Sequence, residues 1–400
     1  MRSHDPMQWA SALSEEADAE RAADAVASAV LGELGDRTPD LAFLFCADAY
    51  APGYERVAAR IREQLPGALL IGCSARSVIG AGREIEGRGA LSLTVAHLPG
   101  VALRAMRVAG DGFPRGTDSW REHFDLAAAP DPHFVLLADP FSGDAEALVR
   151  QLDVDFPEST LVGGLASGAE RAGENALFLG DRTHRDGMVG VALQGDVRVD
   201  SVVAQGCRPI GNPMFVTRVR DQHVLVEIDG RPPVEVIREL FENADARDQA
   251  LLQSSLSIGI EMRPDLSEYR RGDFLIRNIV GADPRTGALT IGAVLEEGLV
   301  VQFHLRDAQT SAEDLDERLA RYQSERGGMG PPAGALLFSC LGRGAWLYGV
   351  PDHDSDALRR HLGAVPLGGF FCNGEIGPVE RRSFLHGYTS AFGLFRPRLA

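Results

Sequence analysis

The 400-residue chain has no lysine: all 40 of its basic residues are arginine. The chain therefore cannot form a lysine Schiff base, use the lysine of a phosphate-binding P-loop, or carry the strand lysine of a protein kinase. Acidic residues number 57, which gives a formal charge of −17. Because nucleic acids and anionic membranes are bound by basic faces, we expect neither as a partner.

Cysteine is also scarce, and the five cysteines are widely spaced without a CxxC pair: Cys46, Cys73, Cys207, Cys340 and Cys372. Such a pattern is typical of reduced thiols. No apolar run reaches the ~18 residues of a membrane span, and the first residues lack the apolar region of a signal peptide. We therefore expect a cytoplasmic protein.

Familiar catalytic motifs are absent, since the sequence contains no HExxH, no GxSxG and no Walker A motif. The run His353–Asp356 (HDSD) contains metal-ligand residue types. It stands directly before a predicted helix, where Asp and Ser are preferred caps, so we favour capping over metal binding. We expect no metal and no cofactor.

What the sequence does contain is a pattern that occurs three times. An apolar run is followed by an amphipathic helix, a second apolar run, a glycine-rich loop and a third strand. The copies begin at LAFLFCADAY (41–50), HFVLLADPFSG (133–143) and GALLFSCLGRG (334–344). Short apolar runs around a helix are typical of buried parallel βαβ units. The predicted fold class is α/β, mixed α+β, with sheets flanked by helices.

Equivalent strand ends of βαβ units lie on one edge of a sheet, because the crossovers are right-handed. Cys46, Asp139 and Cys340 would follow first strands, and loops at Gly72, Gly163 and Gly368 would follow second strands. Ligands bind in α/β proteins beyond the carboxyl ends of strands. Alternatively, these glycines only permit tight strand exits.

The region between the second and third copies predicts an inserted β-meander. MFVTRVRDQHVLVEIDG (214–230) reads as a hairpin, and three further strands follow a helix at VEVIRELFENA (234–244). A helix is also predicted over 14–34, with Ser14 as its cap and Gly35 as its stop. We expect a helical extension (1–36) and two domains, 37–225 and 226–400.

The loop VPLGGFFCNGEIGP (365–378) has the richest set of polar groups. Glycines beside Arg343 would let its guanidinium reach into a cleft and bind a carboxylate. With Asn373 and Glu375, it could bind a zwitterion such as an amino acid. An equally good reading is a structural Arg343–Glu375 ion pair. Gly369 and Gly374 belong to this candidate site.

Cys340 and Cys372 are candidate nucleophiles, with His386 downstream as a base, although cysteine is commonly a small buried hydrophobe. Ser74, Arg76, Asp139 and Ser167 would join the site if the strand ends converge. Two further segments are interpreted more simply. GREIEGRG (82–89) reads as a solvated excursion, and Trp346 and Tyr348 alternate as in a strand.

Several separate motifs, in order over about residues 38–395, resemble the FIST family, with its N-terminal and C-terminal modules in tandem. They are LPGALLIGCSA, GCRPIG with IDGRPPVEVI, LFSCLGRG, VPLGGFFCNGEIGP and FLHGYTSAF. The matching residues are Gly72, Gly206, Arg208, Pro209, Gly211, Gly342, Arg343, Gly344, Gly369, Asn373, Gly374, Glu375 and Gly377.

The resemblance implies a sensory module that binds small ligands, amino acids among them, as in bacterial signalling proteins and a eukaryotic F-box protein. It implies no catalytic residue. No kinase, cyclase or F-box segment is recognised, so we expect output through a separate signalling protein such as a histidine kinase. We therefore expect a non-enzymatic sensor. The alternatives are a cysteine-dependent enzyme acting on acyl or thioester substrates and a protein-interaction scaffold.

Overall fold

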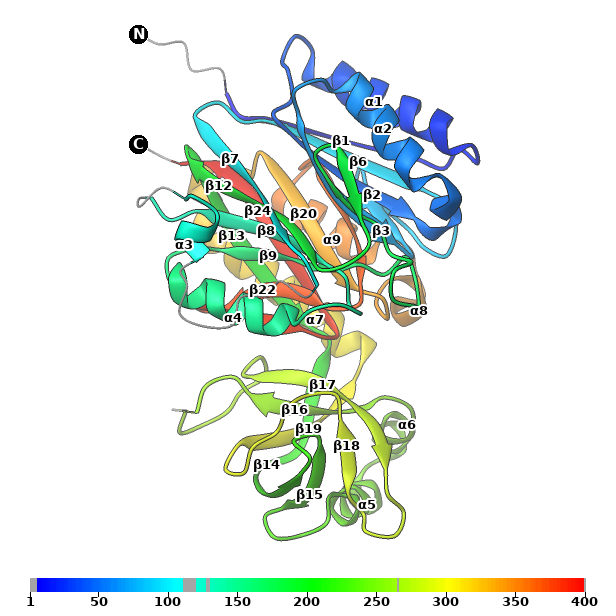
Figure 1. The fold of residues 1–400 in the computed structure, drawn as a ribbon. Coiled ribbons are helices and arrows are strands. Elements are labelled where there is room, and N and C mark those ends of the chain that lie inside the picture. Colours follow the sequence, from blue (N-terminus) through cyan, green and yellow to red (C-terminus); the bar gives the residue numbers. More distant parts are fainter. Residues whose placement is uncertain (1–5, 111–119, 127–129, 265, 399–400) are drawn as a thin grey trace. The chain divides into compact units, whose positions relative to one another are not determined.

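The computed structural model describes residues 6–110, 120–126, 130–264 and 266–398, which form two compact units (Figure 1). Unit 1 comprises Met1–Val203, Leu315–Leu385 and Thr389–Ala400, and unit 2 comprises Ala204–Asp314 and His386–Tyr388. Unit 2 thus interrupts unit 1 in the sequence. The domain limits expected after residues 36 and 225 refer to family modules in the sequence, not to these compact units, and they stay a prediction. Residues 1–5 of the expected extension lie outside the described part.

Unit 1 consists of three repeats that share one order of elements: strand, helix, strand, helix, strand, hairpin, strand. Repeat 1 contains β1 (Gln8–Ser14), α1 (Ala19–Leu34), β2 (Leu41–Ala47), η1 (Asp48–Gly53), α2 (Tyr54–Gln64), β3 (Leu69–Ala75), β4 (Val78–Gly80), β5 (Arg83–Ile85) and β6 (Leu91–His97). Repeat 2 contains β7 (Val101–Val108), α3 (Trp120–His123), β8 (His133–Ala138), α4 (Ala145–Asp155), β9 (Leu161–Leu165), β10 (Leu177–Leu179), β11 (Arg182–His184) and β12 (Met188–Gly195).

Repeat 3 has the same order, with unit 2 inserted after its first strand and one extra short helix. It contains β13 (Val197–Gln205), α7 (Ala308–Arg326), η2 (Gly327–Met329), β20 (Gly334–Cys340), α8 (Ala345–Tyr348), α9 (His353–Leu362), β21 (Leu367–Cys372), β22 (Glu375–Val379), β23 (Arg382–His386) and β24 (Thr389–Pro397). The predicted mixed α+β class with repeated βαβ units and flanking helices is confirmed.

Each repeat builds one six-stranded sheet, and each sheet ends in a hairpin borrowed from another repeat. The orders are β1-β6-β2-β3-β10-β11, β7-β12-β8-β9-β22-β23 and β13-β24-β20-β21-β4-β5. In every sheet the central pair is parallel, and the borrowed hairpin pairs antiparallel to its second strand. The exchange therefore runs in a closed cycle through the three repeats.

The three parallel pairs also share one close backbone contact. A Cβ atom at Gly72, Gly163 or Gly369 would lie 1.8–1.9 Å from the carbonyl oxygen of the facing residue on the neighbouring strand. Those facing residues are Leu44, Leu136 and Leu337, in matching register. Only glycine permits this approach, so these three positions are equivalent in structure.

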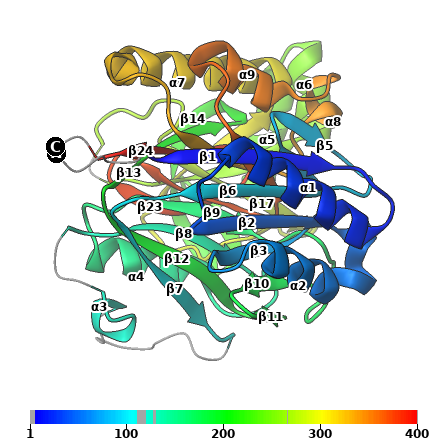
Figure 2. The ribbon, with the colours of Figure 1, turned by 90° about the horizontal axis from the view of Figure 1, so that it is seen from above.

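Helices cover the outer faces of the sheets, as Figure 2 shows for α1 and α2 over the first sheet. The central strands of the sheets are covered on both faces and are therefore largely apolar. In β2, for example, all seven residues are buried. In repeat 3, Asp316 of α7 binds His361 of α9 at 2.8 Å. One apolar core joins the inner faces of the sheets. In it the ring of Phe45 stacks on that of Phe370, with 4.9 Å between the ring centroids.

Unit 2 is a closed barrel with the strand order β14-β15-β18-β17-β16-β19. Its elements are β14 (Cys207–Arg220), β15 (Val224–Ile228), α5 (Pro233–Asn243), α6 (Ala246–Ser254), β16 (Leu256–Glu261), β17 (Phe274–Ala282), β18 (Leu289–Ile291) and β19 (Val300–Arg306). The expected hairpin is present as β14–β15. The expected meander is incomplete, because β19 pairs with β14 and β16 and so closes the barrel.

Four local expectations are wrong. The first helix begins after Asp18, which caps it, and Ser14 ends the unforeseen strand β1. Residues expected in a solvated excursion form β5, where Glu84 is buried. The segment with Trp346 is the short helix α8, not a strand. The HDSD run does not precede a helix: it forms the first turn of α9.

Candidate functional site

The exits of the second strands meet one another. The backbone N–H of Asn373 donates to the carbonyl of Leu165 at 3.1 Å, and that of Ser167 donates to Ser74 at 3.3 Å. The third connection passes through a side chain, because the Ser167 hydroxyl accepts from the N–H of Arg76 and donates to the carbonyl of Phe371. Backbone groups and the Ser167 hydroxyl therefore join the three strand exits to one another.

The segment that follows the second strand has the same length in repeats 1 and 3 but is longer in repeat 2. Strand β4 begins six residues after Gly72 and β22 six residues after Gly369, whereas β10 begins fourteen residues after Gly163. The additional segment, residues 169–176, is called here the pocket loop. At its start Gly168 contacts the neighbouring exit so closely that a Cβ atom would lie 2.6 Å from the Cβ of Ser74.

The pocket loop and the exit of repeat 1 border an open pocket of about 340 Å³. It is lined by Asp48, Arg76, Ser167, Gly168, Ala169, Glu170, Arg171 and Glu174. Two predicted site residues, Arg76 and Ser167, are among these. The pocket lies beyond the carboxyl ends of β2, β3 and β9, where α/β folds place ligands.

A buried polar network fastens the far end of the pocket loop. The Nδ2 group of Asn175 donates to Oδ1 of Asp139 at 2.9 Å, and the Ser74 hydroxyl contacts Oδ1 of Asn175 at 3.2 Å. The Ser142 hydroxyl donates to the second oxygen of Asp139 at 2.6 Å. All but Ser142 are buried. Ser74 and Asp139, both predicted site residues, therefore position the loop from beneath.

Groups of both charges line the pocket. Arg76 has a half-exposed side chain whose guanidinium lies 3.6 Å from the carboxylate of Glu170. Within the described part of the chain, the side chains of Asp48, Arg171 and Glu174 make no hydrogen bond or ion pair. Arg185 donates to the main-chain carbonyls of Glu174 and Asn175, which holds the loop without using its carboxylates.

Arg343 lies elsewhere, in repeat 3, and is fully buried. Its Nε and Nη2 atoms donate to the two carboxylate oxygens of Asp354 at 2.9 and 3.1 Å. Burial alone would raise the pKa of Asp354, but the guanidinium and the hydrogen bonds hold that pKa well below its usual range. The ion pair foreseen between Arg343 and Glu375 is thus replaced by one with Asp354, inside the fold.

The other residues of the glycine-rich loop hold the strand exits together. Both the N–H and the hydroxyl of Thr389 donate to the buried Glu375 carboxylate, at 3.1 and 2.8 Å. The exposed Asn373 donates its side-chain amide to the carbonyl of Ala166 at 2.9 Å. The carbonyl of Gly374 accepts from Leu165 at 2.8 Å. Gly369 is the close-contact glycine of β21.

The two candidate cysteines stand side by side at the ends of β20 and β21. Cys372 is buried and Cys340 is partly buried. Burial raises the pKa of the Cys372 thiol well above its ordinary value, with Glu375 adding to the shift. A protonated thiol is a weak nucleophile, so this position does not favour catalysis by Cys372.

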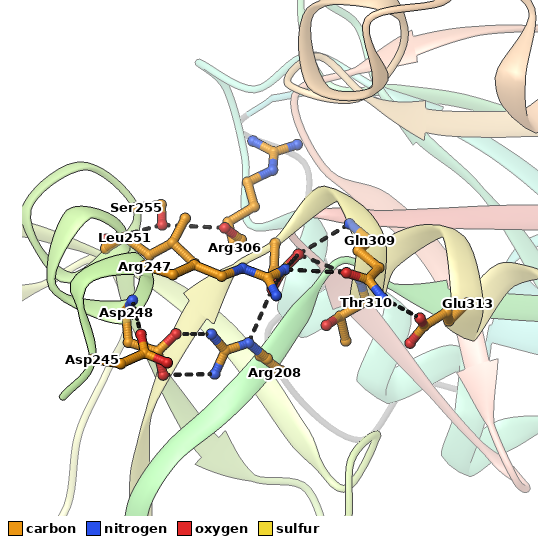
Figure 3. Close-up of polar contacts among 11 residues, drawn as sticks. Arg208, Asp245, Arg247, Asp248, Leu251, Ser255, Arg306, Gln309, Thr310 and Glu313 are labelled. Carbon is orange, nitrogen blue, oxygen red and sulfur yellow. Dashed lines mark hydrogen bonds and ion pairs between the residues drawn. The ribbon is translucent and has the colours of Figure 1, made fainter.

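Unit 2 has a charged cluster of its own, drawn in Figure 3. Arg208 donates to Asp307 at 3.1 Å and also pairs with Asp248, while Arg247 donates to Asp307 at 2.8 Å. Asp307 additionally accepts from the N–H of Gln309 in the first turn of α7. The cluster joins β14, α6 and α7, so Arg208 of the GCRPIG motif serves the framework of the barrel.

Inspection of the sequence missed six residues that line the pocket, namely Asp48, Gly168, Ala169, Glu170, Arg171 and Glu174. It also missed Asn175, which holds the pocket loop from beneath. A signal for most of them was present, because the segment GLASGAERAGEN is longer than its counterparts in the other two copies. Aligning the three copies by their strand glycines would have revealed the additional residues. Asp48 had no such signal.

Three sheets with cyclically exchanged hairpins, a barrel unit and a small polar pocket define a repeat-built α+β protein. Residues 40–231 match the FIST N domain and residues 233–378 match the FIST C domain. The chain belongs to the FIST family, as its motifs predicted. FIST domains are associated with sensory and signalling binding of small ligands.

Several relatives are similar over nearly the whole chain. Uncharacterized protein MT0656 of Mycobacterium tuberculosis is 40% identical over 94% of this chain and 97% of its own length. Uncharacterized protein Mb0898c of Mycobacterium bovis is 37% identical over 94% and 96%. F-box/LRR-repeat protein At5g63520 of Arabidopsis thaliana is 25% identical over 41% of this chain and 34% of its own length. Among the described helices, none is long and apolar enough to cross a membrane.

Proposed function

We propose that this protein is a non-enzymatic sensor that binds a small zwitterion, such as an amino acid, in the pocket between repeats 1 and 2. One observation carries the proposal: a pocket of about 340 Å³, lined by both guanidinium and carboxylate groups, occurs where the pseudo-symmetry breaks. Its volume lies at the small end of the range for ligand pockets, about 300–1,000 Å³.

Arg76 is the carboxylate-binding group in this proposal. Its guanidinium is half exposed, so a ligand can reach it, and its contact with Glu170 is long at 3.6 Å. A planar guanidinium can bind a carboxylate with two parallel hydrogen bonds. Arg343 is unsuited to this role, because it is fully buried and already bound to Asp354 in that way.

The state of three of the five thiols supports a non-enzymatic role. Burial raises the pKa values of Cys46, Cys73 and Cys372 above those of ordinary thiols. An enzyme that uses a cysteine needs the opposite shift. Reaction with a thiol reagent at graded pH examines this point: modification of any cysteine below pH 7 at the rate of an activated thiolate would favour the enzyme instead.

Signal output is proposed to pass to a separate cytoplasmic signalling protein, for example a histidine kinase. The family association with signalling supports this step. Copurification of the protein with candidate effectors, with and without added amino acids, provides the measurement. An effector that binds equally in both conditions would favour a constitutive scaffold.

Thermal-shift measurements with the common amino acids test the binding proposal. A ligand present at about 100 times its dissociation constant adds about 2.7 kcal/mol to stability and so raises the Tm. We expect at least one amino acid to raise the Tm of the wild type and to have no effect on Arg76→Gln. The matched control is Arg381→Gln, which removes another exposed arginine, 3.7 Å from Glu158. Absence of any shift at millimolar concentrations would reject the proposal.

A further inference from the structure

We infer that the pocket between repeats 1 and 2 selects amino acids with a second cationic group, such as ornithine, lysine or arginine. This inference rests on the proposed function and adds the class of ligand. It starts from the charges of the pocket lining, which contains three carboxylates and two guanidinium groups. The carboxylates belong to Asp48, Glu170 and Glu174, and the guanidinium groups belong to Arg76 and Arg171.

Charge balance defines the ligand that this lining complements. The guanidinium of Arg76 lies 3.6 Å from Glu170 and, in the proposed function, binds the ligand carboxylate. The rest of the lining then has three carboxylates and one guanidinium group, which leaves two negative charges in excess. A ligand that complements this lining carries two positive charges and one negative charge. A diamino acid has this set of charges, whereas a neutral amino acid leaves one carboxylate without a partner.

Two of the three carboxylates make no hydrogen bond or ion pair within the described part of the chain, and they come from separate elements. Asp48 begins η1 directly after β2 of repeat 1, and Glu174 lies near the end of the pocket loop of repeat 2. Their backbones are held independently: buried Asn175 fixes the loop beside Glu174, and η1 follows the fully buried strand β2. Two carboxylates on independently held backbone segments can bind two cationic groups of one ligand.

The charge of the whole protein acts in the same direction. With a formal charge of −17, the chain attracts cations and repels anions at low ionic strength. Acidic amino acids would add a second carboxylate to a pocket that already has an excess of them. We therefore expect the order of affinity to be diamino acid, then neutral amino acid, then acidic amino acid.

Calorimetric titration of the full-length protein with L-ornithine, L-norvaline and L-glutamate provides the test. Norvaline has the carbon chain of ornithine without its second amine. We expect ornithine to bind about fivefold more tightly than norvaline at 20 mM salt, the scale of one exposed ion pair. The ratio should fall toward one at 0.5 M salt because the charges are then screened.

Variants separate charge recognition from loss of structure. Glu174→Gln, and independently Asp48→Asn, should lower the affinity for ornithine about fivefold. The variant at the carboxylate that binds the second amine should leave the affinity for norvaline unchanged within twofold, whereas the variant at the carboxylate that binds the α-ammonium should weaken both ligands. Glu33→Gln, at an exposed position of α1, is the control and should change neither. An equal loss for both ligands in the Glu174 and Asp48 variants would overturn the inference.

The experiment distinguishes failure of this inference from failure of the proposed function. Norvaline or glutamate binding to the wild type as tightly as ornithine, with loss in Arg76→Gln, would overturn the charge selection and keep the amino-acid sensor. No binding of any of the three ligands would overturn this inference, and the complete amino-acid panel then decides the proposed function.

Discussion

Gly72, Gly163 and Gly369 show at the residue scale how the repeats are built. Each lies where a methyl group would collide with a carbonyl oxygen of the adjacent parallel strand. For Gly163 and Gly369 the backbone φ of +154° and +152° is also unfavourable for other residues. The repeat pattern placed Gly72, Gly163 and Gly368 in loops just after the second strands. This placement is wrong, because they lie inside β3, β9 and β21, and the close contact in β21 falls on Gly369. The close contacts of Gly72, Gly163 and Gly369 indicate that these glycines permit tight packing of the strands, and in the proposed function the ligand is bound by residues that follow them.

Substitution of one such glycine should therefore be severe. We expect Gly369→Ala to lower the free energy of unfolding of unit 1 by ~4 kcal/mol or more, because backbone must move to admit the methyl group. Gly32→Ala is the control, since it lies in α1 with open space around it. That change should stabilise the protein by about 0.5–1 kcal/mol. Urea unfolding measures both, and a loss below about 1 kcal/mol for Gly369→Ala would contradict this account.

Partner choice at the residue scale was the least predictable part of the site. The sequence indicated Arg343 as a functional cation but paired it with Glu375, its neighbour in the motif pattern. The structure pairs it with Asp354, which had been interpreted as part of a helix cap. Ion pairs between loops follow no periodicity, so sequence spacing carries no information about them. Arg76 and Ser167, in contrast, were correctly predicted to lie near each other, because the repeat pattern places both just after second strands.

At the scale of elements, the exchanged hairpins are the feature that sequence patterns could not reveal. Strands β4, β5, β10 and β11 have three residues each, too few for a periodic signal. Their pairing partners lie in other repeats, so long-range packing decides where they go. The apolar runs of β2, β8 and β20, in contrast, predicted the central strands correctly, because a strand buried on both faces must be apolar throughout.

The exchanged hairpin β4–β5 also caps helices of repeat 3. The Glu84 carboxylate accepts from the N–H of Ser355 at 2.7 Å, in the first turn of α9, and Glu86 accepts from the N–H of Ala345 at the start of α8. Burial raises the pKa of Glu84 to about 8, and the Asp354 carboxylate adds to the shift. This contact should therefore depend on pH.

The folded protein holds a proton on Glu84 that the unfolded chain releases above pH 4.5, the ordinary value. This group's contribution to stability is fully present below pH 4.5 and is lost as pH rises toward 8. We expect the Tm of the wild type to fall between pH 6.5 and 8.5 relative to that of Glu84→Gln. Glu33→Gln should follow the wild type, and identical pH profiles for wild type and Glu84→Gln would contradict this assignment.

The pocket loop depends on the hydrogen bond from Asn175 to Asp139. Asn175→Asp places two carboxylates at this contact, and their repulsion should open the loop. Trypsin should then cleave after the exposed Arg171 faster than in the wild type. Combining Asn175→Asp with Asp139→Asn reverses the direction of one bond and retains all three, so it should restore the wild-type rate. Failure of this exchange to restore resistance would show that the network does not hold the loop.

At the scale of the whole molecule, the chain comprises two units with separate cores, and the second interrupts the third repeat. The sequence predicted the threefold pattern and recognised the inserted segment by its change of composition. It did not predict that the insertion forms a closed barrel, because barrel closure depends on the pairing of β14 with β19, far apart in the chain.

Two units with separate cores should unfold in two steps. We expect calorimetry to resolve two transitions, of which an amino-acid ligand raises only that of unit 1, where the pocket lies. Gly369→Ala identifies the transition of unit 1 by lowering it alone. A ligand that raised the other transition instead would place its site in the barrel.

Hydrogen exchange with and without saturating ligand tests the central claim most directly, because it locates the site without any variant. The probe is L-ornithine, or whichever amino acid raises the Tm most. The account predicts slower exchange at the pocket loop, residues 169–176, and at the strand exits near Asp48 and Arg76. It predicts no change around Arg343 and α9. Protection centred on Arg343 and the loop 365–378, with the pocket loop unaffected, would contradict it.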